Sequence, residues 1–143
     1  RLCVCPEHPL SQESQVSFQQ LRHEKFILLK EDSFHRHAII EQCRKYHFTP
    51  QIVFSSNQIQ TIKALVSSGA GISFLMHMVV AQDSPHIVSI PLHEPIEIAI
   101  GLAWKKDKYL SKASQAFIQF VNEYTQSPHF RSPCCLLPHV YSP

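Results

Sequence analysis

The chain has 143 residues, of which 44% are hydrophobic and 17% charged, and its formal net charge is +2 with histidines neutral. This composition is typical of a globular protein with one domain or two small lobes, and it excludes an intrinsically disordered chain. The small charge does not by itself indicate nucleic-acid binding, and the basic run of Lys105, Lys106 and Lys108 is interrupted by Asp107, as in a solvated turn.

The apolar runs and the cysteines limit where the protein works. No run of about 18 apolar residues is present, so we expect no membrane span, and no signal peptide is visible. The five cysteines show neither a disulfide framework nor zinc-ligand spacing. We therefore expect a reducing, cytoplasmic setting. Because the chain begins with arginine, we also expect it to be a fragment of a longer protein.

The first third of the chain predicts two short strands around a helical turn. The apolar, β-prone residues 2–5 end at Pro6, and a polar loop follows. Ser17 and Gln20 have the spacing of a capping box at a helix start, with Val16 and Leu21 as its hydrophobic staple. The continuous apolar run at 25–30, bounded by lysines, is typical of a strand buried on both faces.

Two amphipathic helices follow, separated by a strand at 51–55. The first is expected to begin at Asp32 or Ser33 and to end before Pro50. The second is expected to be capped within 55–57. Their apolar stripes are Ile39, Cys43 and Tyr46 in the first, and Ile59, Ile62, Leu65 and Val66 in the second.

Two of the three glycines, Gly69 and Gly71, follow the second helix. A dinucleotide-binding loop requires G-x-G-x-x-G after a strand and before a helix, but here the order is reversed and position 74 is Phe. The pair therefore predicts a helix-to-strand corner, with Gly69 at positive φ and Gly71 passing close to neighbouring backbone.

The remaining elements complete an alternating pattern. We expect strands at 72–76, 86–92 and 96–104, then a final helix capped by Ser111. The proline-rich tail at 127–143 shows no periodicity. Strands alternating with helices predict an α/β fold with a mainly parallel sheet and helices on both faces.

In such sheets, ligands bind at the carboxyl ends of the strands, beside helix N-termini. Two corners qualify, residues 30–35 and residues 55–58. Their backbone N–H groups and helix dipoles suit a carboxylate or other small anion, although Glu31 and Asp32 oppose a strongly anionic ligand. Lys30 would add a positive charge, and Ser33, Ser55, Ser56 and Asn57 would donate hydrogen bonds; the alternative is that these polar residues are ordinary helix caps.

Evidence for catalysis or metal binding is missing from the sequence. His35 and His37 are two residues apart, so on a helix they do not share a face, and no third ligand has suitable spacing. Cys43 lies on an apolar stripe, where a thiol is inert. No nucleophile elbow or paired-carboxylate motif is present. We therefore expect no enzyme activity, no cofactor and no metal.

Several segments, in this order, carry a resemblance to a known family. They are KFILLKEDSFHRHAIIEQCRKYHFTPQIVFSS, TIKALVSSGAGISFLM and AIGLAWKKDKYLSKASQAFIQFV. Together they resemble the effector-binding domain of LysR-type bacterial transcriptional regulators over residues 2–125. The closest pieces are the helix that ends in V-x-x-G-x-G-I-x-x-L and the W-K-K-D before the last helix.

The resemblance implies two α/β lobes of the periplasmic-binding-protein type around a cleft that holds an effector. It implies that residues 1–95 form lobe two, that residues 96–126 return to lobe one, and that 127–143 form an irregular tail. It also implies effector contacts from the loop at 31–34 and from Ile100 and Gly101. Together with the two corners, the expected effector-binding residues are Lys30, Glu31, Asp32, Ser33, Phe34, Ser55, Ser56, Asn57, Ile100 and Gly101.

The sequence departs from the family pattern in three respects. The helix-turn-helix and the start of lobe one are missing, and Met76 stands where the family often has proline. The resemblance implies a homodimer or homotetramer that senses a small molecule, such as a carboxylate or amino acid, and binds DNA only through the missing N-terminal domain. The alternative is a transport-type solute-binding lobe of the same architecture.

Overall fold

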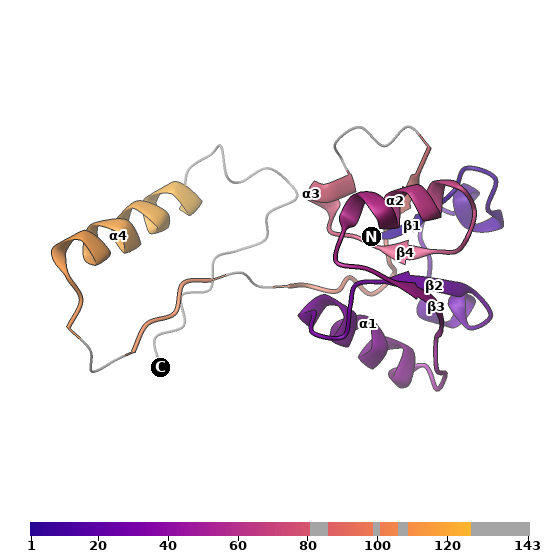
Figure 1. Cartoon of the computed structure of the whole chain (residues 1–143), viewed down its shortest axis with the longest axis horizontal. Helices are drawn as coiled ribbons and strands as arrows, with labels where there is room; N and C mark the ends of the chain where they lie inside the picture. The colour runs from indigo at the N-terminus through magenta and orange to yellow at the C-terminus, as the bar shows by residue number, and fades with distance from the viewer. Residues whose placement is uncertain (81–85, 99–100, 106–108, 127–143) are drawn as a thin grey trace. The chain divides into compact units, whose positions relative to one another are not determined.

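The computed structural model describes residues 1–80, 86–98, 101–105 and 109–126, and divides the chain into two units, Arg1–Ile96 and Glu97–Pro143 (Figure 1). The lobe assignment at similar boundaries remains a prediction. The first unit contains, in chain order, β1 (Leu2–Val4), the 3-10 helices η1 (Pro9–Gln12) and η2 (Phe18–Leu21), β2 (Lys25–Leu28), α1 (Phe34–Lys45), β3 (Gln51–Ser55), α2 (Ile59–Ser67), β4 (Ser73–Phe74), α3 (His77–Val80) and β5 (Val88–Ile90).

The strands of the first unit run mainly parallel. β2 pairs with β3 in parallel, and a parallel bridge between Phe26 and Ile72 joins β2 to the residue before β4. β1 is antiparallel to both β4 and β5, so β2, β3, β4 and β5 share one direction and β1 opposes them. β1 is the central strand of a three-stranded sheet in the order β4-β1-β5, and β2 and β3 form a two-stranded parallel sheet. An α/β fold in which most strands run parallel is therefore confirmed, and β1 is the exception.

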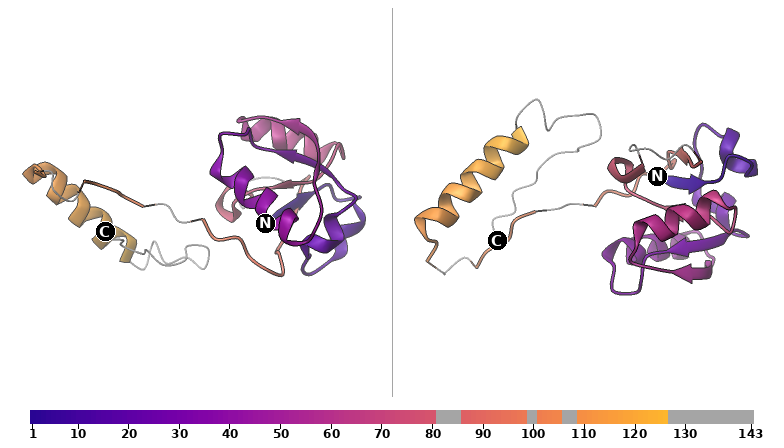
Figure 2. Two further views of the ribbon diagram at one scale, coloured as in Figure 1. Left: turned by 90° about the horizontal axis from the view of Figure 1, so that it is seen from below. Right: turned by 45° about the horizontal axis from the view of Figure 1, so that its top comes forward.

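Each face of the strands has its own apolar core, because alternate side chains of a strand point to opposite faces. The larger core lies on the α1 side and includes an aromatic group in which Phe74 stacks on Phe18 and Phe26 at centroid distances of 5.3 and 5.9 Å. The smaller core lies on the α2 side and includes Ile27, Ile62 and Val66. Helices therefore cover both faces, as predicted (Figures 1 and 2).

The predicted capping box at Ser17 is present, but it begins a single 3-10 turn, η2. The Ser17 N–H donates to Gln20 Oε1 at 2.8 Å. Both Phe18 and Leu21 are buried in the larger core. The turn is short because the chain must extend again at Lys25 to enter β2.

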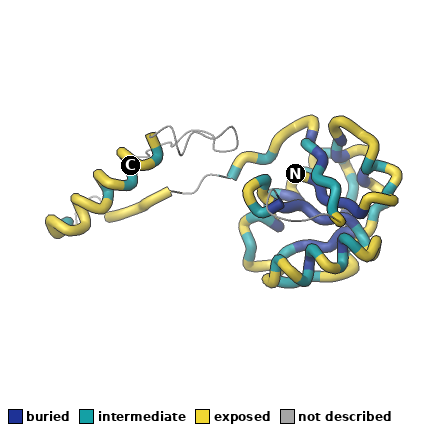
Figure 3. The backbone as a smooth tube through the Cα atoms, turned by 90° about the horizontal axis from the view of Figure 1, so that it is seen from above, coloured by how far each residue is buried: buried dark blue, intermediate teal, exposed yellow. Residues whose placement is uncertain are grey.

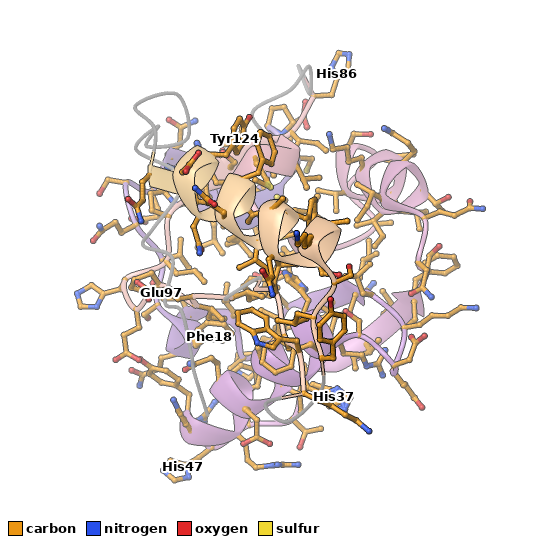
Figure 4. The ribbon with its side chains drawn as sticks, turned by 90° about the vertical axis from the view of Figure 1, so that its left-hand side faces the viewer. Phe18, His37, His47, His86, Glu97 and Tyr124 are labelled. Carbon is orange, nitrogen blue, oxygen red and sulfur yellow. The ribbon has the colours of Figure 1, made fainter. Side chains whose placement is uncertain are left out.

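The glycine corner forms as predicted. Gly69 has φ +75° and closes α2 with two hydrogen bonds, from its N–H to Val66 O at 3.0 Å and from Ala70 N–H to Leu65 O at 3.1 Å. This pattern is a Schellman motif. The same motif ends α1, where the non-glycine residue His47 has φ 57° and projects away from the ribbon (Figure 4).

The second unit contains α4 (Lys112–Gln126), and Ser111 caps it as predicted, since Ser111 Oγ accepts from Ser114 N–H at 3.1 Å. The prediction of a strand at 96–104 is wrong for its described residues, 96–98 and 101–104, which form no ladder. A strand needs a pairing partner, and the described part of this unit supplies none. Among the described residues, all the buried ones lie in the first unit (Figure 3). The predicted tail at 127–143 lies outside the described residues.

No helix in the described part of the chain is long and apolar enough to cross a membrane.

Candidate functional site at the carboxyl ends of β2 and β3

The two predicted corners lie at the same edge of the sheet. β2 and β3 are parallel neighbours, so their carboxyl ends meet, and the loops that follow them are joined by hydrogen bonds. The Lys30 N–H donates to Asn57 Oδ1 at 3.3 Å, and the Ser56 N–H donates to Leu28 O at 3.1 Å. Residues 28–30 and 55–57 are therefore held side by side at this edge.

Arg36 is a central residue of this edge that the sequence analysis missed. It lies in the first turn of α1 and is only 8% exposed. Its Nη1 donates to Leu29 O at 3.2 Å and to Ser55 Oγ at 2.7 Å, and its Nη2 lies 3.4 Å from Glu31 Oε1. One guanidinium thus connects the end of β2, the end of β3 and the loop between β2 and α1.

A sequence signal for Arg36 was available. The buried residues of α1 are Arg36, Ile39 and Cys43. Their spacing of three and then four places all three on one helix face. A helix that turns Ile39 and Cys43 inward therefore also buries Arg36, and a buried arginine needs hydrogen-bond acceptors.

The loop before α1 is open to solvent. Lys30, Glu31 and Asp32 are exposed, and Phe34 is 71% exposed. Ser33 is the N-cap residue, as predicted, but its side chain makes no capping hydrogen bond. Its hydroxyl is therefore not used to close the helix end.

The cap expected within 55–57 is displaced. α2 begins at Ile59 with Gln58 as its N-cap, so the prediction that one of these residues caps the helix is wrong. The Asn57 side chain accepts the Lys30 N–H instead, and Ser56 Oγ accepts from Gln58 N–H at 3.0 Å. Both side chains organise the two loops and do not serve as helix caps.

The remaining two predicted site residues fall in the second unit, Glu97–Pro143. Ile100 lies outside the described residues. Gly101 is exposed in the second unit, where an added Cβ would meet no atom within 4 Å. Their predicted contribution to the site remains untested.

Burial shifts the pKa values of two side chains of α1, Cys43 and His35. Cys43 is fully buried, and burial raises the pKa of its thiol to about 12. Burial lowers the pKa of His35 below its ordinary value. Among the described residues, no group of three His, Cys, Asp or Glu side chains is arranged to hold a metal ion.

The strand order, the helices on both faces and the polar edge define an α/β lobe of the periplasmic-binding-protein type. The chain matches the family described as "LysR substrate binding domain" over residues 1–126. It therefore belongs to the LysR substrate-binding domain family.

Individual proteins agree with this assignment. The HTH-type transcriptional regulator YwbI of Bacillus subtilis is 33% identical over 129 residues, which cover 89% of this chain and 43% of that protein. The crystal structure of HinK, a LysR family transcriptional regulator from Pseudomonas aeruginosa, superposes with a TM-score of 0.69 at 28% identity, covering 86% of this chain and 43% of that one.

The fold is also shared with a more distant regulatory domain. The CcmR regulatory domain of Synechocystis PCC6803, in complex with 2-PG, has a TM-score of 0.73 at 18% identity and covers 89% of this chain and 62% of that one. At this identity the likeness concerns the fold alone. The chain spans less than half the length of the curated relatives it matches.

Proposed function

We propose that this chain is the effector-sensing part of a LysR-type transcriptional regulator, and that it binds a small metabolite at the edge formed by residues 30–34 and 55–57. Effector binding would change the arrangement of lobes or subunits and, through it, how a separate helix-turn-helix segment meets a promoter. The parent protein would act as a homodimer or homotetramer. Ile100 and Gly101 are proposed as further effector contacts.

One observation carries the site proposal: the hydrogen bond from Lys30 N–H to Asn57 Oδ1 joins loops that are 27 residues apart in sequence. Loops joined at the carboxyl ends of parallel strands are the usual ligand position in open α/β sheets. The uncommitted Ser33 hydroxyl and the exposed Phe34 ring add a polar and an apolar contact to this edge. The complex of the CcmR regulatory domain with 2-PG supports a small-molecule role for the fold.

The proposal is tested by a thermal-shift screen of small carboxylates and amino acids on the full-length protein. A true effector stabilises the folded state in proportion to its free concentration relative to its dissociation constant. We expect at least one compound to raise the melting temperature in a saturable manner. Ser33→Ala and Phe34→Ala should reduce that increase and leave the melting temperature without ligand nearly unchanged, because both positions are only lightly packed.

Ser68→Ala is the matched control, since Ser68 is exposed at the far end of α2 and its hydroxyl donates only to Leu65 O. If both loop variants respond to the stabilising compound as strongly as Ser68→Ala, the effector binds elsewhere. The site proposal then fails, whereas membership of the family is unaffected.

A further inference from the structure

The positive charge of Arg36 is buried, but its counter-charge on Glu31 is not. The Arg36 side chain is 10% exposed, whereas the Glu31 side chain is 90% exposed and its carboxylate lies at 3.4 Å. Within the described residues, this is the one ion pair that Arg36 makes. Arg36 also lies in the first turn of α1, where the helix dipole is unfavourable to a cation. A buried cation in this position is under-compensated.

The contact between Arg36 and Ser55 fixes the role of the Ser55 hydroxyl. A guanidinium only donates, so at 2.7 Å from Arg36 Nη1 the Ser55 oxygen must be the acceptor. The hydroxyl hydrogen of Ser55 is then directed elsewhere, and among the described residues the Ser55 hydroxyl donates no hydrogen bond. Ser55 is half-buried at the end of β3, beside the exposed loop at 30–34. Its hydroxyl is therefore a donor polarised by a cation.

From this geometry we propose that Ser55 is a specificity-determining residue: its hydroxyl donates to an anionic group of the effector, such as a carboxylate, and Arg36 supplies the compensating charge behind it. This inference rests on the proposed function and names the chemical class that the site accepts. Glu31 repels an anionic effector only weakly. Its carboxylate is either paired with Arg36 or turned into solvent, because the side chain is 90% exposed.

The test is a titration of the isotope-labelled chain with acetate and succinate, and with acetamide and succinamide as neutral partners of the same shape. Backbone amide shifts of residues 30–36 and 55–59 report on binding at the two loops. Constant ionic strength keeps charge screening equal in the two series. We expect saturable shifts at these amides with the carboxylates and none with the carboxamides.

Two substitutions at Ser55 test whether its hydroxyl donates a hydrogen bond to the carboxylate or only fills space. Ser55→Ala should weaken carboxylate affinity by about tenfold or more, the usual effect of losing a hydrogen bond to a charged group. Ser55→Glu places a carboxylate beside Arg36, so it should abolish the shifts and raise the unfolding midpoint relative to Ser55→Ala. Ser67→Ala and Ser67→Glu are the controls, because the Ser67 hydroxyl donates only to Ala64 O within α2.

Each outcome decides the inference. Carboxylate-specific shifts that depend on Ser55 support it. Shifts at the two loops that are equal for carboxylate and carboxamide, or unchanged in Ser55→Ala, overturn it and leave the proposed site in place. The absence of saturable shifts at both loops overturns the inference and also counts against the site. A lower midpoint for Ser55→Glu than for Ser55→Ala, with no such loss at Ser67, contradicts the charge deficit at Arg36.

Discussion

The backbone of Gly71 lies against the carbonyl oxygen of Lys25, so closely that a Cβ on Gly71 would be 2.5 Å from that oxygen. The contact forms where Ile72 exchanges hydrogen bonds with β2, from Ile72 N–H to Lys25 O and from Ile27 N–H to Ile72 O, both at 2.8 Å. This exchange joins the pair β2 and β3 to the other three strands. Gly71 is therefore required for the continuity of the sheet.

The first prediction concerns this close approach. Gly71→Ala should lower the free energy of unfolding by about 3 kcal/mol, at the upper end of overpacking effects, because the obstacle is backbone rather than a flexible side chain. Urea denaturation of wild type and variant measures the change. Ala70→Gly, at an exposed neighbour, is the control for backbone entropy, and a Gly71→Ala variant as stable as wild type would disprove the close contact.

His47 and Gly69 both follow a helix with φ in the left-handed region, and substituting them should change stability in opposite directions. His47→Gly should stabilise the protein by about 1 kcal/mol, since glycine adopts positive φ without the steric penalty of a side chain. Gly69→Ala should destabilise it by a similar amount for the same reason, and Gly69→Val by more. Thermal denaturation of the three variants is the measurement. A loss of stability in His47→Gly would show that its imidazole makes a contact that outweighs the strain.

A buried serine also predicts a gain in stability. Ser73 in β4 is 1% exposed, and its hydroxyl has no hydrogen-bond partner among the described residues. Ser73→Ala removes a desolvated polar group and should raise the free energy of unfolding by about 1 kcal/mol. Chemical denaturation of the variant beside Ser68→Ala, whose hydroxyl is exposed, tests this, and a marked destabilisation would reveal an unrecognised partner of Ser73.

The pH dependence of stability follows from the buried thiols. Burial raises the pKa of Cys43 from 9.0 to about 12, so the folded state keeps this proton after the unfolded state has lost it. The corresponding stability is intact below pH 9.0 and is lost as the pH rises toward about 12. Between about pH 8 and pH 10, the decline in wild type should exceed that in Cys43→Ala by about 1 kcal/mol.

Denaturation of both proteins at the two pH values measures this difference, and any constant effect of the substitution cancels. Burial also raises the pKa of Cys3, to about 11, so some alkaline decline should persist in Cys43→Ala. Equal slopes for the two proteins would mean that the Cys43 thiol ionises as readily in the folded state as in the unfolded state, contrary to its burial.

The sequence predicted the elements whose signals are local. Apolar runs identified β2 and β3, the spacing of Ile39 and Cys43 identified α1, and the pair Gly69 and Gly71 identified the corner after α2. The strand expected at 96–104 was wrong because an apolar run forms a strand only when a partner is available, and local sequence does not report partners.

The position of the two loops was predicted from the sequence, but the contacts between them were not. Helix starts after strands correctly placed residues 30–34 and 55–57 at one edge, whereas their role in effector binding remains a prediction. The hydrogen bonds of Asn57 and of Arg36 reach across 27 and 19 residues, and no local pattern encodes such contacts. Only the periodicity that buries Arg36 with Ile39 and Cys43 offered a sequence signal for its role.

The most direct test of the central claim, that the edge formed by residues 30–34 and 55–57 holds the effector, is amide hydrogen exchange of the full-length protein with and without a stabilising metabolite from the screen. The account predicts slower exchange in residues 30–36 and 55–61 when the metabolite is bound. Protection confined to other segments, with these two loops exchanging as fast as in the free protein, would contradict it.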